Sequence, residues 1–383
     1  MYFSETETAR RRGMLHETMD DLGLEAVVLL APAPSPTAQE EFYFLQNDYI
    51  ASGLSATVVP RTGDPTTISP YLQSLSHAQF STSSDCRVYG ETQSPAALLG
   101  DVLTEKGISA GRVGWRWSNV PAYSYEHLRG ALPDVEWVDI SGAFKDMWYR
   151  KSSEEAEAGL RSAELAAAGY RHLLEVIEPG MTEWDVVTEF ESFTFRNGAN
   201  RNFTIVASGP LESGRAFPEL RPATRRRLEP GDLVMMEMTP AVSGFYTQLV
   251  RTIAVGPATD QAQQLKDVAV TAIRAATGVL RPGATVGQVA SALKSAVEAA
   301  GFGTSFPFGH TVGVDLVLDR LLPDLDRVLH ENDTVIIHPR VHTPDGHYSF
   351  FWGETYLVTA AANIRMGGVG DALESARLTL ATH

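Results

Sequence analysis

The chain has 383 residues, of which 44% are hydrophobic, enough apolar material for large cores in two or three domains. Lys and Arg number 31 and Asp and Glu number 47, so the formal net charge is 31 − 47 = −16. This charge argues against nucleic acid as a partner, because phosphate binding needs clustered basic residues. The single cysteine, Cys86, excludes a disulfide framework and a cysteine-rich metal site.

The sequence also bears on location. No apolar run reaches the ~18 residues of a membrane-spanning helix, and no signal peptide is visible at the N-terminus. We therefore expect a cytoplasmic protein without a membrane partner.

Residues 1–148 alternate strand-like and helix-like segments, which is typical of an α/β domain. They contain no glycine-rich nucleotide fingerprint or phosphate loop. The predicted strands cover residues 26–30, 56–60, 112–115 and 135–138, and the predicted helices cover residues 7–22, 96–107 and 121–131.

A second domain is expected from residue 149 to residue 383. Ser152 and Glu155 have the spacing of a capping box, so a long helix should begin there and run to Glu178. Runs of helices beside runs of strands indicate an α+β domain with antiparallel pairing. Further helices are predicted at 182–197, 260–279 and 285–300, with strands at 202–206, 233–238, 246–255, 306–316, 333–339 and 349–359.

This second part of the chain contains an internal repeat. Residues 228–237 resemble residues 329–338: each is a turn ending in Asp, then an apolar strand, then one polar side chain. Residues 179–182 and 245–248 are echoed by residues 282–285 and 351–354. A period of about a hundred residues is too long for a solenoid and indicates one duplicated half. A pseudo-twofold axis would then bring four side chains toward one cavity: Glu237, Gln248, His338 and Glu354.

The order and spacing of these motifs resembles the pita-bread superfamily, which includes methionine aminopeptidase, prolidase, aminopeptidase P, creatinase and ectoine hydrolase. The matching segments are residues 231–237, 244–252, 308–315, 334–339 and 352–359. The resemblance implies a duplicated pita-bread domain over residues 149–383. It also implies a creatinase-type, ribonuclease H-like α/β domain over residues 1–148.

In the metallopeptidases of that superfamily two metals are held by Asp, Asp, His, Glu and Glu. The resemblance puts these positions at Glu237, Gln248, His310, His338 and Glu354, of which only His310 and Glu354 match. A neutral Gln248 cannot bridge two cations as a carboxylate does, and His338 offers one ligand nitrogen. We therefore expect the dinuclear site to be lost and assign no metal ligand.

The site pattern is closest to those of creatinase and ectoine hydrolase, which work without metal. It predicts a homodimeric, non-peptidase hydrolase that cleaves a C–N bond of a small polar molecule without a cofactor. His310 would carry the proton to the leaving nitrogen, and Glu237 or Glu354 would activate water. The expected catalytic residues are His310, Glu237, Glu354 and His338, and the expected substrate-binding residues are Gln248, Tyr246 and Arg251.

Two alternatives stay open from the sequence. His310, His338 and Glu354 are the ligand set of a mononuclear site, so one Fe, Mn or Zn ion could be bound with Glu237 or Gln248 as a further ligand. Such a protein would be a metalloenzyme of specialised metabolism. The other alternative is a non-catalytic binding module, since a histone chaperone has this fold.

Overall fold

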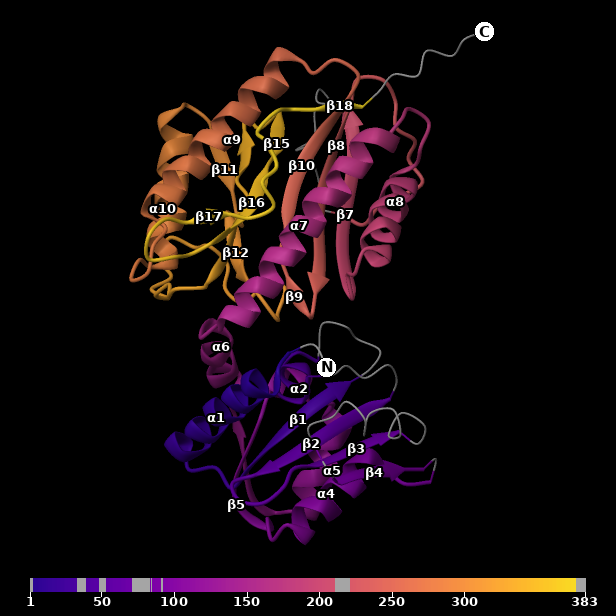
Figure 1. The fold of residues 1–383 in the computed structure, drawn as a ribbon, viewed down its shortest axis with the longest axis vertical. Coiled ribbons are helices and arrows are strands. Elements are labelled where there is room, and N and C mark those ends of the chain that lie inside the picture. The colour runs from indigo at the N-terminus through magenta and orange to yellow at the C-terminus, as the bar shows by residue number, and fades with distance from the viewer. Residues whose placement is uncertain are drawn as a thin grey trace. The chain divides into compact units, whose positions relative to one another are not determined.

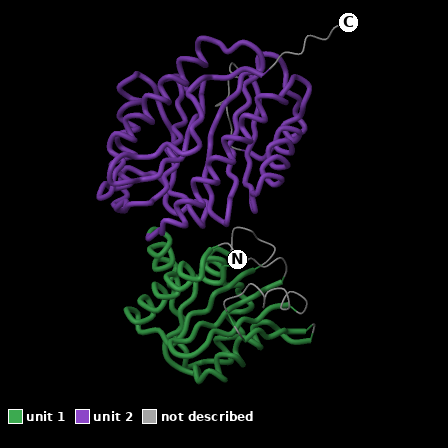
Figure 2. Tube along the Cα trace, in the orientation of Figure 1, with its two compact units in different colours: residues 1–149 green, residues 150–383 purple. Residues whose placement is uncertain are grey.

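The computed structural model describes residues 3–32, 39–47, 53–70, 83, 85–90, 92–210 and 221–376. The chain forms two compact units, residues 1–149 and 150–383 (Figure 2). Within the described ranges, no helix is long and apolar enough to cross a membrane.

The first unit is built on a six-stranded mixed sheet in the order β4-β3-β2-β1-β5-β6. Its central strand β1 (Ala26–Pro32) pairs antiparallel with β2 (Leu54–Pro60) and parallel with β5 (Ala110–Trp115). The predicted strands and helices in this region are present, with boundaries shifted by a few residues. The remaining elements are α1 (Glu5–Leu22), α2 (Glu40–Gln46), β3 (Thr66–Pro70), β4 (Asp85–Tyr89), α4 (Pro95–Glu105), η1 (Trp117–Asn119), α5 (Ala122–Ala131), β6 (Asp134–Asp139) and α6 (Ser141–Tyr149).

The second unit carries a sheet with the strand order β12-β13-β16-β10-β8-β7 and a smaller sheet β11-β14-β15 (Figure 1). The short strands β9, β17 and β18 pair with β8, β16 and β10, respectively, outside this order. The helices are α7 (Ser153–Val176), α8 (Glu183–Arg196), α9 (Asp260–Val279) and α10 (Val286–Ala299). The strands are β7 (Arg201–Pro210), β8 (Asp232–Val242), β9 (Phe245–Tyr246), β10 (Leu249–Val255), β11 (Gly303–Ser305), β12 (Gly309–Val312), β13 (Thr334–Ile337), β14 (Arg340–His342), β15 (Ser349–Phe351), β16 (Gly353–Leu357), β17 (Ile364–Arg365) and β18 (Ser375–Ala376).

Helix starts in this unit follow local capping chemistry. The Ser152 hydroxyl accepts from the Glu155 backbone N–H, and the Glu155 carboxylate accepts from the Ser152 N–H, as the sequence predicted. Thr182 and Thr285 form the same reciprocal arrangement at the starts of α8 and α10. These boxes satisfy backbone donors that would otherwise lack partners.

The predicted duplication is visible in individual hydrogen bonds. Gly180 N–H donates to Leu228 O at 2.8 Å, and Gly283 N–H donates to Leu329 O at the same distance. The turns that follow end in Asp232 and Asp333, whose carboxylates accept from Glu229 N–H at 2.8 Å and from His330 N–H at 2.7 Å. The two copies therefore share backbone geometry as well as sequence pattern.

Two predicted strands are divided in the structure. The segment 349–359 forms β15, which pairs with β14 in the small sheet, and β16, which pairs with β13 in the large sheet. The segment 246–255 divides into β9 and β10. The division changes which side chains share a face, because successive residues of a strand point to opposite sides.

The larger sheet has two faces with different surroundings. Met236, Leu249 and Ile253 pack against Tyr170 and other residues of α7, and Ile337 packs against α9. We call this the helix face. The opposite face carries Glu237, which alternates with Met236 and Met238 along β8, and we call it the site face.

Candidate active site

Glu237 and Gln248 form the first half of the candidate site. Val250 is the register partner of Glu237, and Gln248 lies two residues before Val250, so both polar side chains are on the site face. Gln248 Nε2 donates to Glu237 Oε2 at 3.2 Å. Glu237 is 6% exposed, and this burial raises the pKa of its carboxyl group to about 7, against a smaller lowering by the Gln248 amide.

Two hydrogen bonds to Thr355 of β16 hold the backbone of Gln248 in place. The Gln248 backbone N–H donates to Thr355 Oγ1 at 3.0 Å, and the Thr355 hydroxyl donates to Gln248 O at 2.8 Å. The side-chain oxygen of Gln248 is buried and has no hydrogen-bond partner among the described residues. An unpaired buried acceptor of this kind is suited to a ligand donor.

The second half of the site is a pair of histidines. His310 pairs in register with Ile336, and His338 lies two residues further on, so both imidazoles are on the site face. Their ring centroids are 5.3 Å apart with an interplanar angle of 68°. His310 Nδ1 lies 3.3 Å from Thr311 O, which can only accept, so we assign the proton to Nδ1 and the lone pair to Nε2.

Both imidazoles are neutral at physiological pH. Burial lowers the pKa of His310 to about 3, helped by the neighbouring His338, and burial lowers the pKa of His338 to about 4. His338 Nδ1 has no hydrogen-bond partner within the described part of the chain. The pair can thus accept or relay a hydrogen bond but does not present a standing positive charge.

One row across the sheet joins the two halves. Glu237, Val250 and Gly353 are successive register partners on β8, β10 and β16. A Cβ added at Gly353 would lie 2.3 Å from the Cβ of His338, so the histidine occupies the space beside that glycine. Two strand spacings, about 10 Å, separate Glu237 on β8 from Gly353 on β16. Glu237 and His338 therefore lie at the two ends of this row, on one face of the sheet.

Arg320 adds a positive charge to the rim of the site. It forms an isolated antiparallel bridge with His310, and bridge partners project to the same side of a sheet. Its charge contributes to the lowered pKa of both His310 and His338. The sequence analysis did not single out Arg320, because no motif marks it.

Glu354 and Arg251 do not join this group, which corrects the prediction for both residues. Glu354 pairs in register with Leu249 and Ile337, two residues of the helix face. Its carboxylate accepts hydrogen bonds from Arg251 and Arg365. Side-chain alternation is the reason: on β16 it is Gly353, one residue earlier, that lies on the site face. Arg251 is a buried partner of Glu354 and not a substrate contact.

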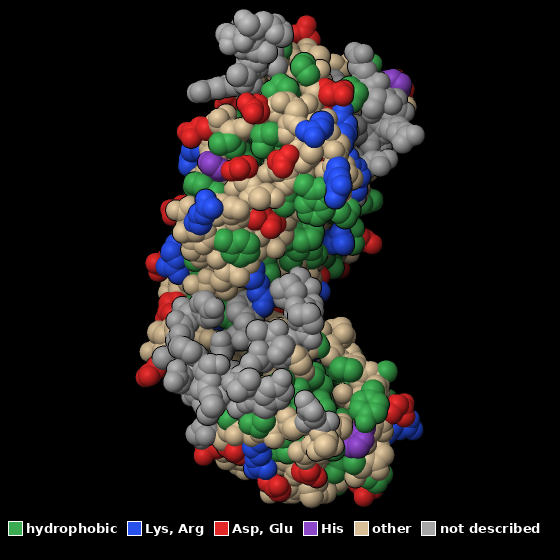
Figure 3. All heavy atoms as spheres, turned by 90° about the vertical axis from the view of Figure 1, so that its right-hand side faces the viewer, with side chains coloured by type: hydrophobic (Ala, Val, Ile, Leu, Met, Phe, Trp, Pro, Cys, Tyr) green, Lys and Arg blue, Asp and Glu red, His purple; other side chains and the backbone are tan. Residues whose placement is uncertain are grey.

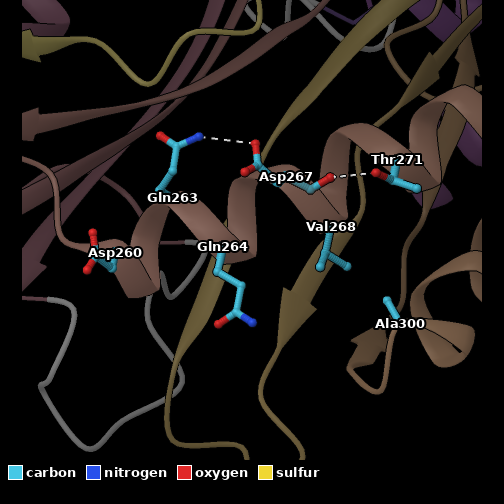
Figure 4. A pocket seen from close by; sticks show the side chains of 7 residues that line it. All are labelled: Asp260, Gln263, Gln264, Asp267, Val268, Thr271 and Ala300. Atoms are coloured by element: carbon cyan, nitrogen blue, oxygen red, sulfur yellow. Dashed lines mark hydrogen bonds between the residues drawn. The ribbon is translucent and has the colours of Figure 1, made fainter.

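Tyr246 is buried on β9 and packs in a cluster with Ala241, Val312 and Leu316. Phe351 also borders the site, with its ring 5.1 Å from that of His338. A separate surface groove of about 380 Å³ lies on the outer side of α9 and is lined by Asp260, Gln263, Gln264, Asp267, Val268, Thr271 and Ala300 (Figure 4). Its residues are distinct from those of the candidate site.

Comparison with known families identifies the class. The description "Metallopeptidase family M24" matches residues 158–360, and "Creatinase/Prolidase N-terminal domain" matches residues 11–147. The chain therefore belongs to the creatinase/prolidase group of metallopeptidase family M24. Both the pita-bread resemblance and the predicted fold class are confirmed.

Individual relatives show the same membership. The chain is 25% identical over 363 residues to creatinase from a Bacillus species, covering 90% of this chain and 85% of the relative. It is 27% identical over 214 residues to a Xaa-Pro dipeptidase of Pyrococcus furiosus, covering 55% and 60% of the two chains. The solved structure of a Xaa-Pro dipeptidase from Bacillus anthracis has a TM-score of 0.81, with 21% identity and coverage of 96% and 99%.

These findings correct the predicted function. The prediction of a non-peptidase hydrolase that works without the family's metals is contradicted, because the relatives are named as Xaa-Pro dipeptidases and other peptidases. The relatives support an enzyme of hydrolase type and neither of the two alternatives. The expectation of no cofactor is also contradicted, because the family is described as one of metallopeptidases.

The side chains present do not match the donor set expected of two cations. Gln248 is neutral, Glu354 lies on the helix face bound by two arginines, and Gly353 has no donor. In the described part of the chain, no group of three His, Cys, Asp or Glu residues is placed to hold a metal ion. The single-ion alternative fails for the same reason, because His310 and His338 are not joined by Glu354.

Proposed function

We propose that this chain is a hydrolase that cleaves the peptide bond of short peptides carrying a free carboxylate. The names of its relatives support a peptidase, and the site face supplies an acid, two imidazoles and a cation. The observation that carries the proposal is that Glu237, a buried carboxyl group with a pKa of about 7, lies on the same face of the sheet as His310 and His338. A general base works best when its pKa is near the working pH.

In this proposal each side chain has a distinct role. Glu237 accepts a proton from the attacking water and returns it to the leaving nitrogen. His310 Nε2, with its free lone pair, orients the water or the substrate N–H. The Gln248 amide holds the Glu237 carboxylate in place, and its free oxygen receives a substrate N–H. Tyr246 forms part of the apolar wall through its packing on Val312.

Arg320 supplies the recognition of the carboxylate. Its side chain projects to the side of His310, and no described residue forms an ion pair or hydrogen bond with its guanidinium. A charge-assisted contact of this kind contributes roughly 1.5–3 kcal/mol. Arg320→Gln should therefore raise KM about tenfold or more for free dipeptides and leave dipeptide amides unaffected.

The test is a panel of dipeptides, with Xaa-Pro included, assayed by release of free amino acid. One arm contains added Mn²⁺, Co²⁺ or Zn²⁺ and the other contains none, so the result does not depend on the choice of cofactor. Glu237→Gln should lower kcat at least a hundredfold, the usual contribution of a general base. His310→Ala should lower it by a comparable factor.

The matched control is His172→Asn. His172 pairs with Glu189 at 3.1 Å between α7 and α8 and has no part in the site. Activity in this variant should equal that of the wild type. The proposal is rejected if no dipeptide is cleaved in either arm, or if Glu237→Gln keeps full activity.

We further propose a homodimer. Trp184 and Phe195 on α8 and Phe203 on the edge strand β7 are 50%, 51% and 40% exposed. Hydrophobic side chains gather on this side of the second unit (Figure 3). Exposed aromatic clusters mark protein interfaces. Sedimentation should give a dimer mass, and Phe195→Glu with Phe203→Glu should give a monomer.

The cytoplasmic location stays a prediction.

A further inference from the structure

A second cavity lies on the helix face of the large sheet, between α9 and the strands β16 and β17. Its volume is about 190 Å³. Glu354 and Trp352 of its lining alternate with Gly353, which faces the candidate active site, so the two sites lie on opposite faces of β16. The cavity has no part in the function proposed above.

One part of the cavity wall is apolar. Val270 and Ile273 project from α9, and Trp352 directly precedes β16; they are 8%, 6% and 1% exposed. All three belong to the core cluster that joins α9 to the sheet. This part of the wall suits a hydrocarbon group, because transfer of apolar surface from water to such a wall is favourable.

In the polar part of the wall, the carboxylate oxygens already accept hydrogen bonds from arginines. Glu354 accepts bonds from Arg251 and Arg365, which together engage both of its oxygens. Asp371 Oδ1 accepts from Arg365 Nη2 at 2.6 Å. The carboxylates in the wall therefore have little capacity left for a cationic ligand.

The donors, in contrast, are partly free. Arg274 is 73% exposed at its side chain, and among the described residues its guanidinium pairs with Asp371 Oδ2 alone, at 3.5 Å. Arg365 Nη1 bonds to no described residue, and the Tyr356 hydroxyl likewise has no bond within the described ranges. Arg251, which pairs with Glu354, is a third guanidinium group beside the cavity, where the carboxylates are those of Glu354 and Asp371. This excess of donors and positive charge favours an anion.

We propose that this cavity binds a small monocarboxylate with a short branched hydrocarbon body. The carboxylate lies between Arg274 and Arg365, where Asp371 now takes the place of a ligand, and the body packs on Val270, Ile273 and Trp352. The volume corresponds to about six water molecules, which fits an acid of roughly seven non-hydrogen atoms. 3-Methylbutanoate has this size and shape.

The test is calorimetric titration of the full chain with sodium 3-methylbutanoate and, separately, with 3-methylbutanamide. The acid should bind and the isosteric amide should not, because only the acid pairs with the arginines. Arg274→Gln should weaken binding about tenfold or more. Arg161→Gln, at an exposed arginine of α7 that pairs with Glu157, should leave binding unchanged.

Two further variants complete the design. Asp371→Asn should tighten binding, because it removes the internal carboxylate that competes for Arg274 and Arg365; this variant gives a gain even if Arg274→Gln folds poorly. Glu237→Gln should bind the acid like the wild type, which separates this cavity from the proposed active site. The proposal is overturned if acid and amide bind equally, if no heat is seen up to about 10 mM acid, if Asp371→Asn fails to tighten binding, or if Glu237→Gln abolishes it.

Discussion

At the residue scale, Glu237 couples the stability of the protein to pH. Its carboxyl group is almost fully buried, and its pKa in the fold is about 7, against an ordinary value of 4.5. Between these two pH values the folded protein holds a proton that the unfolded chain has released. The contribution of this carboxyl group to the free energy of unfolding is therefore fully present below pH 4.5 and is lost as the pH rises through about 7.

Glu237→Gln removes this titration. The variant should be more stable than the wild type at pH 8, by on the order of 3 kcal/mol, and should differ little from it at pH 5. Chemical denaturation at the two pH values measures the difference. Glu298→Gln, at a carboxylate whose side chain is 53% exposed and pairs with Lys294, is the control and should change stability by a similarly small amount at both pH values. An equal effect of Glu237→Gln at both pH values would contradict the buried-acid assignment.

Gly353 is sterically required by His338. A methyl group at position 353 would lie 2.3 Å from His338 Cβ and 2.7 Å from Ile337 O, so the strand or the histidine would have to move. Gly353→Ala should destabilise the protein by about 1–3 kcal/mol, as overpacking does, and should displace the His338 imidazole resonance in NMR spectra.

The control for this change is Gly278→Ala in α9. Position 278 has no atom within 4 Å of an added Cβ. Alanine is a better helix former than glycine by about 1 kcal/mol, so this variant should be neutral or slightly more stable in thermal melts. Equal destabilisation by both substitutions would show that steric conflict at His338 is not the cause.

At the element scale, the alternation of side chains along β16 places the candidate site on one face of the strand and a buried ion pair on the other. Gly353 and Thr355 face the candidate site, and Glu354 faces the helices together with Arg251. Arg251 is fully buried; it donates to Gly353 O at 2.7 Å and to Val250 O at 2.8 Å. The Arg251–Glu354 pair therefore ties β10 to β16 at the level of the row that carries Glu237.

Glu354→Gln leaves the Arg251 charge without its buried partner. Loss of one member of a buried pair destabilises proteins by roughly 3–5 kcal/mol, and Arg365 loses the same partner here. Glu157→Gln breaks the exposed pair with Arg161 and should change stability by less than about 1 kcal/mol. Urea denaturation of both variants tests the contrast. Similar midpoints would show that the buried pair contributes no more to stability than the exposed pair.

The elements themselves were largely predictable from local sequence. The Ser152 capping box, the turns ending in Asp232 and Asp333, and the apolar strands that follow are all encoded within a few residues. The face on which Glu354 lies was not, because it depends on where β15 ends and β16 begins. A shift of one residue exchanges the two faces, and motif spacing alone does not resolve it.

Arg320 escaped prediction for a related reason. Its place beside His310 comes from a bridge between two segments ten positions apart, formed when the chain returns after a turn. Likewise, the neutral state of His310 and His338 follows from burial by residues distant in sequence. The sequence located the site's region, while strand register decided which side chains share it.

At the scale of the whole molecule, each unit has its own apolar core. Trp115, Val28 and Leu103 belong to a cluster within residues 1–149, and the clusters around Leu265 and Phe190 lie within residues 150–383. A unit with its own core folds independently in most proteins.

A fragment of residues 150–383 should therefore fold alone. Circular dichroism should show a cooperative melt, and NMR spectra should show dispersed resonances. The complementary fragment, residues 1–149, serves as the comparison and should behave likewise. A non-cooperative melt of the 150–383 fragment would mean that its core needs the other half of the chain.

The duplicated turns have a consequence for how the two halves can diverge. The first copy places Gly231 at φ 92°, and the second places Asn332 at φ 69°, each just before the aspartate that closes the turn. Glycine and asparagine are the residues that adopt this left-handed shape most readily. The two copies therefore keep a turn of the same handedness, while the positions beyond it carry unlike side chains, Glu237 in the first copy and His338 in the second. β-Branched residues should be poorly tolerated at both turn positions, which saturation mutagenesis with a stability readout would test.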